Sequence, residues 1–293
     1  MTTRQPEFGL FLIPEADNYA GLTDLAAYAD THGLDLIGIQ DHPYQRRFFD
    51  TWTLITALAV RTTRLAFFPD VANLPLRNPA VLAKSVASLD IITGGRVHLG
   101  LGAGAFWDAI AGMGGARLSG GEALRATGEA IEIIRAMWSD ERTARVPGEF
   151  HRLVGIHPGP APAHAPGIWL GASGPRMLAL TGARADGWLP SSSWATPEFL
   201  TEAGARIDDA AAAAGRDPSA VRRLYNVSGT ITDGADGGFL AGPVERWVDD
   251  LIALHLERRV DGFVFWPSEG DAAAQVRRYT EQVVPAVRAA VAR

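Results

Sequence analysis

The sequence predicts an α/β protein folded as a (β/α)8 TIM barrel, with insertions after the fourth strand. Strand-length apolar runs alternate with helical patterns along the whole chain, and each helical pattern follows a strand run, as a parallel barrel requires. The length of 293 residues is within the range of one barrel with insertions. We therefore expect a single domain over residues 1–293.

Apolar runs bounded by turn residues predict the strands. The eight runs are Phe8–Ile13, Leu36–Gln40, Leu65–Val71, Val97–Leu101, Ile168–Gly171, Gly187–Leu189, Leu224–Ile231 and Gly262–Trp266. Segments with a 3.6-residue apolar period, several opened by proline, predict the helices. These are about Tyr19–His32, Thr51–Thr62, Pro79–Ile92, Gly121–Trp138, Pro175–Arg184, Pro197–Ala214, Pro243–His255 and Asp271–Ala292.

Two stretches interrupt this alternation and are predicted to be insertions. Residues Ala103–Gly120 are rich in glycine and alanine, and Ser139–Gly167 contains several prolines and histidines. We expect both to be long loops, whose conformation the sequence does not specify. Long loops beside a barrel strand are typical of lids or mobile segments that shape a binding site.

Composition excludes several classes of function. The formal charge is −6 and the arginines are scattered, so no nucleic-acid surface is expected. The chain has no cysteine, which excludes disulfides, thiolate metal sites and a cysteine nucleophile. Residues Met1–Glu7 are polar and the next apolar run has only strand length. We therefore expect no signal peptide, no membrane contact and a cytoplasmic location.

Two glycine-rich strand exits are candidate ligand sites. Gly100–Ala105 fits the dinucleotide fingerprint formally, but three strand–helix units precede it, which favours the exit of a barrel strand. Gly171–Pro175 resembles a nucleophile elbow, but Pro175 replaces the second glycine and disfavours a hydrolase. The second exit leads directly into a helix, so it is either a phosphate site at a helix N-terminus or an ordinary turn.

Histidine positions suggest one proton-transfer group and no metal site. His42 follows Asp41 at the end of the second strand, where barrel enzymes place catalytic residues; the alternative is a hydrogen-bonded structural histidine. His98 is predicted inside the fourth strand. The remaining histidines lack metal-ligand spacing. The residues Trp107, Trp194 and Trp266 lie near strand exits and could form an aromatic wall or simply pack in the core.

The chain resembles the luciferase-like monooxygenase superfamily, whose barrel enzymes bind flavin or the deazaflavin coenzyme F420. The resemblance covers nearly the whole chain, with many ordered matches. They include Trp52–Ala59, Arg77-Asn78-Pro79, Gly94-Gly95-Arg96, Leu99–Gly104, Trp169–Pro175 and Ala183–Trp188.

The resemblance implies positions for the cofactor. Ala172, Ser173, Gly174, Pro175 and Arg176 would hold its phosphate, with the ring over the barrel mouth beside Gly102, Ala103 and Gly104. It also implies a strained bulge backing the ring at Asp70, Val71 and Ala72, including a non-proline cis bond, which needs a functional reason because such a bond costs about 3–4 kcal/mol.

The same resemblance implies a reaction class. Asp41-His42 is similar to the pair in the F420-dependent branch, so we expect hydride exchange with a small organic substrate, with His42 handling the coupled proton. Sugar-phosphate dehydrogenases of that branch have glutamate where this chain has Ala105, and Phe106-Trp107 favours a more apolar substrate.

Two alternatives remain open. One is a monooxygenase using reduced FMN delivered by a separate reductase, and the other is a cofactor-binding barrel without catalysis. Relatives commonly pair through the second and third helices, so a homodimer is expected. The apolar residues assigned to that surface are Trp52, Leu54, Leu58, Val81 and Leu82.

Overall fold

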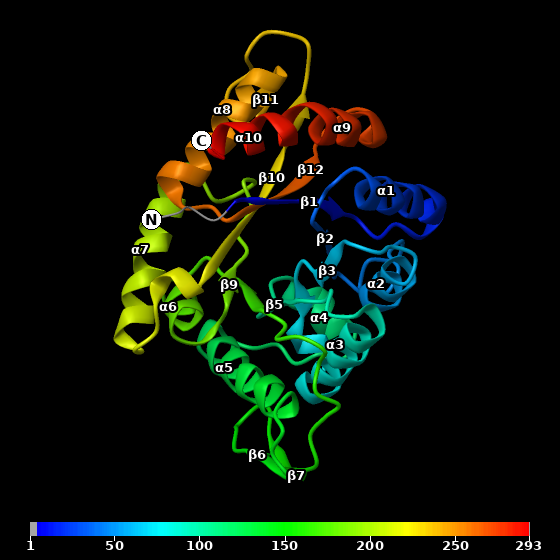
Figure 1. Cartoon of the computed structure of the whole chain (residues 1–293). Coiled ribbons are helices and arrows are strands. Elements are labelled where there is room, and N and C mark those ends of the chain that lie inside the picture. The colour runs from blue at the N-terminus through cyan, green and yellow to red at the C-terminus, as the bar shows by residue number, and fades with distance from the viewer. Residues whose placement is uncertain (1–4, 293) are drawn as a thin grey trace.

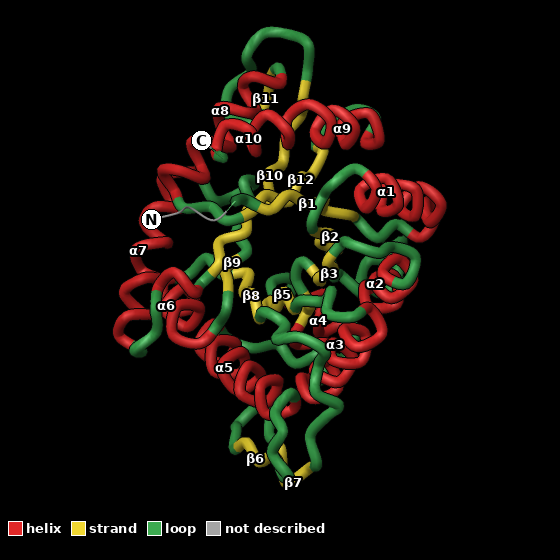
Figure 2. Tube along the Cα trace, viewed as in Figure 1, coloured by secondary structure: helices red, strands yellow, loops and turns green. Residues whose placement is uncertain are grey.

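The computed structural model describes residues 5–292 and shows strands at the centre of the molecule with helices around them (Figures 1 and 2). The barrel strands are β1 (Glu7–Leu12), β2 (Leu36–Ile39), β3 (Ala66–Pro69), β4 (Ala72–Asn73), β5 (Leu99–Gly102), β8 (Ile168–Gly171), β9 (Gly187–Trp188), β10 (Arg222–Ile231) and β12 (Gly262–Pro267). Neighbouring strands pair in parallel in the order β3-β2-β1-β12-β10-β9-β8-β5-β4.

An isolated parallel bridge between Phe67 and Val97 joins β3 to the start of β5. The amide of Phe67 donates to the carbonyl of Arg96 at 2.8 Å, and the amide of His98 donates to the carbonyl of Phe67 at 2.9 Å. These bonds connect the two ends of the strand path. The predicted TIM-barrel class is confirmed as a nearly closed, mostly parallel barrel. A short strand, β11 (Ala241–Gly242), extends β10 on one side.

The helices cover the outside of the barrel (Figure 2). They are α1 (Tyr19–Thr31), α2 (Thr51–Ala59), α3 (Pro79–Thr93), α5 (Gly120–Met137), α6 (Pro175–Arg184), α7 (Pro197–Ala213), α8 (Val244–Arg258), α9 (Ala272–Arg278) and α10 (Val284–Val291). Local capping explains several beginnings: Asp50 caps α2, Asn78 caps α3, and Ser119 forms a capping box with Glu122 on α5.

Two predicted elements are divided in the structure. The expected strand Leu65–Val71 ends at Pro69, because the Asp70–Val71 peptide bond is cis and the backbone resumes as β4, which pairs with β5 instead. The expected helix Asp271–Ala292 contains a π-helical turn at Tyr279–Val283 between α9 and α10. The π-helical turn leaves the buried residues of this helix on one face. The bulge shifts the alternation of the strand, because Phe68 and Val71 both belong to the inner cluster and Phe67 and Ala72 to the outer one.

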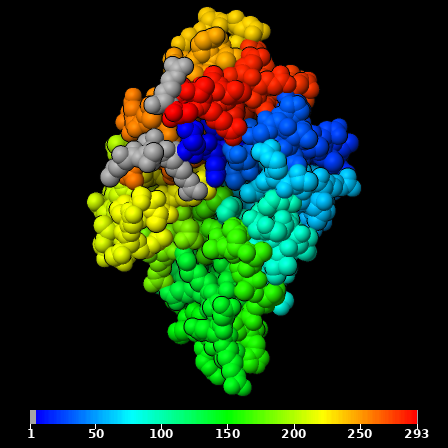
Figure 3. Space-filling model, viewed as in Figure 1, coloured from blue at the N-terminus to red at the C-terminus, as the bar shows by residue number. Residues whose placement is uncertain are grey.

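Both insertions contain regular structure that the sequence did not predict. The stretch 103–120 includes the short helix α4 (Trp107–Gly112). The stretch 139–167 includes an antiparallel hairpin of β6 (Ala144–Val146) and β7 (Leu153–Ile156). The hairpin lies at the narrow end of the molecule, coloured green in Figure 3, away from the barrel strands in Figure 1.

Two apolar clusters stabilise the fold. The larger one fills the space between barrel and helices. The smaller cluster fills the inside of the barrel and consists of Phe11, Leu36, Phe68, Trp169, Leu189, Leu224 and Val264. The barrel is therefore a packed core, and ligands have access at its ends.

The surface predicted for dimer contact is largely wrong. Trp52, Leu54, Leu58 and Leu82 are buried in the larger cluster because this face of α2 and α3 turns toward the strands. Val81 alone of the five is exposed, at 65%. Within residues 5–292, no helix is long and apolar enough to cross a membrane.

Candidate active site

The carboxyl ends of the parallel strands bring the predicted site residues to one end of the barrel. Residue Ala72 pairs with Leu101, and Gly102 pairs with Gly171 across β5 and β8. His42 follows β2, which pairs with β3 immediately before Asp70. We call this end the mouth, and the residues from the exits of β2, β3, β5 and β8 lie around it.

Val71 explains the glycines at the mouth. A Cβ atom on Gly102 would lie 2.6 Å from a methyl group of Val71, and one on Gly100 or Gly171 would lie 3.2 Å from a methyl group of the same residue. A side chain at Gly102 would overlap Val71, and a Cβ on Gly171 would be tight against it. Gly100 is required above all by the Pro69 carbonyl oxygen, which its Cβ would meet at 2.1 Å. The segment Gly100–Ala105 is thus a barrel strand exit on which Val71 rests.

The remaining residues of this exit have different surroundings. Ala103 is half-buried, and Gly104 has a φ of 100°, a conformation that favours glycine. A Cβ on Gly104 would lie 2.8 Å from both Pro75 and Trp107. Trp107 therefore packs on the strand exit at the start of α4.

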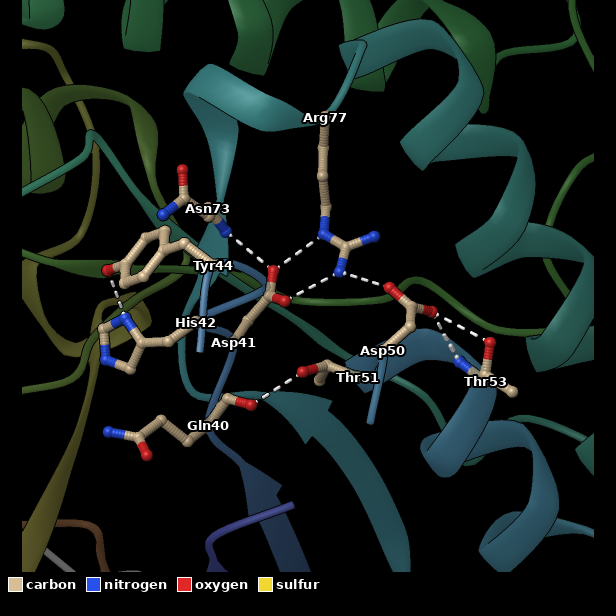
Figure 4. A network of polar contacts seen from close by, with 9 residues as sticks. All are labelled: Gln40, Asp41, His42, Tyr44, Asp50, Thr51, Thr53, Asn73 and Arg77. Carbon is tan, nitrogen blue, oxygen red and sulfur yellow. Dashed lines mark hydrogen bonds and ion pairs between the residues drawn. The ribbon is translucent and has the colours of Figure 1, made fainter. Parts of the chain in front are cut away.

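A polar network fixes the loop that carries His42 (Figure 4). The buried carboxylate of Asp41 accepts two hydrogen bonds of 2.7 Å from the Arg77 guanidinium and one of 2.9 Å from the Asn73 amide. Arg77 also donates to Asp50 at 2.8 Å, and Asp50 caps α2. Bidentate Arg–carboxylate pairs have a defined geometry, so the β2 exit is held against α2 and the β4 segment.

His42 lies beside this network with an aromatic neighbour on each side. Its Nδ1 is 2.5 Å from the Tyr44 hydroxyl, and its ring meets Phe106 edge-on at a centroid distance of 5.4 Å. Burial lowers the pKa of His42, although the Asp41 carboxylate opposes this shift. Burial raises the pKa of Tyr44, which keeps the phenol protonated. The hydroxyl can thus donate to Nδ1, so that Nε2 bears the proton of the neutral imidazole.

Asp70 is the other titratable side chain at this end. It is 8% exposed, and desolvation raises its pKa to about 7, while the contacting Asn226 side chain partly lowers it. Its neighbour Val71 forms the wall described above. The cis bond predicted at this bulge is present between Asp70 and Val71.

The second glycine exit presents an open helix N-terminus. Ala172 is buried, and its carbonyl accepts a 2.8 Å hydrogen bond from the Trp188 indole. Ser173, Gly174, Pro175 and Arg176 are all exposed. Gly174 caps α6 without a side-chain hydrogen bond, so the first-turn amides are available to an anion.

Other candidates lie elsewhere. His98 is at the opposite end of the barrel, stacked on Trp169 at 4.4 Å, with Nδ1 accepting a hydrogen bond from the Gly167 amide. Trp266 stacks on Phe11 and Trp194 packs against Phe199, so the proposed aromatic wall is not a single cluster. Among residues 5–292, no group of three or more His, Asp or Glu side chains is arranged to hold a metal ion.

The sequence missed three residues of the mouth. Arg77 lies in the matched Arg77-Asn78-Pro79 motif, but no local signal in the sequence pairs it with Asp41. Tyr44 lies two residues after His42 and carried no pattern of its own. Asn226 is a polar residue within an apolar strand, and this break in the apolar pattern could have identified it as a candidate site residue.

Comparisons with known proteins identify the family of the chain. The profile of the family described as luciferase-like monooxygenase matches residues 4–236. A 5,10-methylenetetrahydromethanopterin reductase of Methanolobus tindarius is 34% identical over 73% of this chain and 62% of its own length. An F420-dependent glucose-6-phosphate dehydrogenase of Nocardia farcinica is 29% identical over 70% of this chain and 63% of its own length. The match thus spans less than two thirds of either relative.

A solved structure shares the fold across the whole chain. An F420-dependent secondary alcohol dehydrogenase, solved with an F420-acetone adduct, superposes with a TM-score of 0.85. The match covers 97% of this chain and 99% of the other, at 18% sequence identity. At this identity the likeness establishes the barrel architecture alone.

Proposed function

The chain belongs to the luciferase-like monooxygenase family, and we propose that it is an oxidoreductase that uses the deazaflavin coenzyme F420 to transfer hydride to or from a small organic molecule. The observation that carries this proposal is the Asp41-His42 pair, fixed by Arg77 at the barrel mouth opposite the Val71 wall. The F420-dependent dehydrogenase among the relatives supports the choice of cofactor.

The residues at the mouth fit such a cofactor. The uncapped N-terminus of α6 offers amides to a phosphate, with Ser173, Gly174 and Arg176 exposed beside it. Val71, seated on Gly102, offers an apolar surface to a flat ring. When bound there, the deazaflavin would accept or supply the hydride.

His42 would handle the proton coupled to hydride transfer. Its lowered pKa keeps the imidazole neutral at physiological pH, and with Tyr44 donating to Nδ1 the protonated Nε2 would donate to a reacting oxygen. In the opposite direction of transfer, the tautomer in which Nδ1 donates to the Tyr44 oxygen would leave Nε2 to accept the proton. Asp41 holds the loop through its bonds to Arg77 and the backbone amide of Asn73. The His42 side chain is thus the proposed catalytic residue.

The surroundings of His42 favour a small, partly apolar substrate. Tyr44 and Phe106 pack around the imidazole, and Phe106 is 60% exposed. Ala105 supplies no carboxylate at the β5 exit. The carboxylate of the nearby Asp108 is paired with Arg117. A charged sugar phosphate would find little at this wall that recognises its hydroxyl groups.

The first experiment is a titration of the purified protein with F420 and FMN, each oxidised and reduced, followed by absorbance and fluorescence. Tight F420 binding with weak FMN binding supports hydride transfer. A preference for reduced FMN, with substrate-dependent oxygen consumption, would instead identify a monooxygenase served by a separate reductase. Binding of neither would contradict the proposal and leave a barrel of another function.

A homodimer remains part of the proposal. With most of the expected contact residues buried, the exposed apolar side chains on α3 are Val81, Ile91 and Ile92. Light scattering on the purified protein gives the mass in solution, and a mass of one chain would contradict this part.

A further inference from the structure

Asp70 occupies an interior position in the barrel that is unusual for a carboxylate. Its side chain lies over Gly38 of β2, and a Cβ atom on that glycine would come within 3.0 Å of the Asp70 Oδ2. The residue is 8% exposed, and Oδ2 has no hydrogen-bond partner. Oδ1 of Asn226, whose side chain contacts Asp70 from β10, also lacks a partner.

The elements packed around Asp70 supply no compensating charge. Strand β2 presents Gly38, β10 presents Asn226, and the segment of Asp70 itself adds the side chains of Phe68 and Val71. None of these groups titrates.

The charged side chains directly after β2 and at the start of β10 are already paired with other residues. Asp41 and His42 follow β2, and Asp41 is bound to Arg77. At the far end of the barrel, Arg222 pairs with Glu7 at 2.5 Å. Of the ion pairs in the part of the chain that the structure describes, none includes Asp70.

An ionised carboxylate in such surroundings is costly, because water is removed and no cation replaces it; the contact with the Asn226 side chain offsets only part of this cost. The neutral acid has an O–H that can donate to an acceptor such as an amide oxygen. Desolvation, the largest influence on this group, accordingly raises the pKa of Asp70 to about 7. The burial of Asp70, the lack of a cation beside it and its raised pKa together favour a proton on Asp70 below about pH 7.

We propose that Asp70 is a proton-bearing residue beneath the ring site and that its neutral form selects the reduced, more negatively charged state of the bound cofactor. This inference rests on the proposed function, in which the ring lies against Val71, the residue next to Asp70. Transfer of a hydride moves two electrons and one hydrogen nucleus, so the ring gains one negative charge while the Asp70 proton stays in place. An ionised Asp70 would repel that charge in a poorly solvated interior.

The first test needs no cofactor. Urea unfolding of the free protein is measured from pH 4 to pH 8 for the parent, for Asp70→Asn and for the exposed control Asp249→Asn on α8. Because the folded pKa of Asp70 is raised, its contribution to stability is present below about pH 4 and is lost as pH rises toward 7. We expect Asp70→Asn to remove this pH-dependent loss and Asp249→Asn to retain it.

The second test measures the affinity for reduced and oxidised F420 at the same pH values. Where binding requires neutral Asp70, the Kd of the reduced form should rise about tenfold per pH unit above pH 7 in the parent. In Asp70→Asn the Kd should not show this rise. Ionisation of the cofactor itself affects both proteins equally, so the difference between the two pH profiles reports Asp70 alone. If Asp70→Asn does not fold, Asp70→Ser, which also removes the carboxyl group, takes its place.

The outcomes separate this inference from the proposed function. Equal pH dependence of affinity in the parent and Asp70→Asn overturns the inference while F420 binding still supports the function. Equal pH dependence of unfolding in these two proteins overturns the proton-bearing role directly. Failure of the parent to bind either redox form of F420 overturns the proposed function and the cofactor selection together. The unfolding data still show whether Asp70 is protonated in the folded protein.

Discussion

The two ends of the barrel each carry a histidine, and the surroundings of His42 and His98 differ sharply. His42 is half-buried at the carboxyl end, with Nδ1 on the Tyr44 hydroxyl. His98 lies at the amino end between Trp169 and His164, where burial first and the neighbouring His164 and Arg222 second lower its pKa to about 3. The same side chain is therefore a proton-transfer candidate at one end and a neutral packing residue at the other.

This difference follows from what each end of the barrel can expose. Loops after the strands leave the carboxyl end accessible, and its helix α6 is uncapped. At the amino end, the Arg222 guanidinium pairs with Glu7 and lies 5.8 Å from the centre of the Trp169 ring. The histidine at the carboxyl end is therefore placed for chemistry, and the histidine at the amino end is placed for packing.

The comparison is tested most strongly by His42→Ala. Loss of a positioned proton-transfer group lowers the rate by about 10²–10⁴-fold. Because His42 is only half-buried, the urea midpoint should stay near that of the parent. The rate is measured as substrate-dependent oxidation or reduction of F420. An unchanged rate would remove His42 from the mechanism.

A matched control for this variant is Tyr44→Phe, which deletes only the hydroxyl that contacts Nδ1. We expect a smaller loss of rate, because the imidazole remains. Equal losses in the two variants would show that His42 acts only together with the Tyr44 hydroxyl.

The opposite end predicts a stability effect at acid pH. The folded pKa of His98, about 3, is below the ordinary value of 6.5, so its contribution to stability is complete above pH 6.5 and is lost as pH falls toward 3. At 1.36 kcal/mol per unit, the loss approaches about 4–5 kcal/mol by pH 3. His98→Gln should unfold with a weaker acid dependence in urea titrations from pH 7 to pH 3.

The exposed His32→Gln is the control for that measurement, because it removes a histidine on the outer surface of α1. It should retain the acid dependence of the parent. If the acid dependence of His98→Gln equals that of the control, water reaches His98 more readily than the packing around it indicates.

A smaller effect is expected at the network that holds His42. Arg77→Met leaves the Asp41 carboxylate, whose side chain is 0% exposed, without its cation, and breaking such a pair costs about 3 kcal/mol or more. Arg117→Met breaks the Asp108 pair on the surface and should change stability by less than about 1 kcal/mol. Urea unfolding compares the two. Similar small losses would mean that Asp41 gains water when Arg77 is absent.

Much of the barrel could be predicted because its strands are buried on both faces and appear as short apolar runs. Each of the predicted runs overlaps a strand of the structure. The bulge after Pro69, the helix α4 and the hairpin β6–β7 could not be predicted, because each is too short to show a clear hydrophobic period. In α2, the residues Leu54 and Leu58 were assigned to the surface, but apolar side chains identify an apolar face without saying what covers it.

The residues at the mouth could be predicted where they directly follow a predicted strand. His42 and Ser173 follow directly from the positions of two strands. The pairing of Asp41 with Arg77 could not be predicted, because 36 residues separate them along the chain and only the closed barrel brings them together. Asp70 was located at the bulge, but its isolation depends on Gly38 and Asn226 from other strands, whose register the sequence does not specify.

The seating of Val71 has a consequence for redesign of this protein. One side chain from the β3–β4 connection occupies the space in which Gly100, Gly102 and Gly171 would carry their own. Gly102 and Gly171 therefore form a linked set with position 71, and a larger residue at either of them requires a smaller one at 71. At Gly100 a Cβ would also meet the Pro69 carbonyl oxygen at 2.1 Å, which no change at 71 relieves. Libraries that vary the mouth one residue at a time would miss such combinations, whereas paired changes at 71 and 102 would move the wall of the site without emptying the barrel.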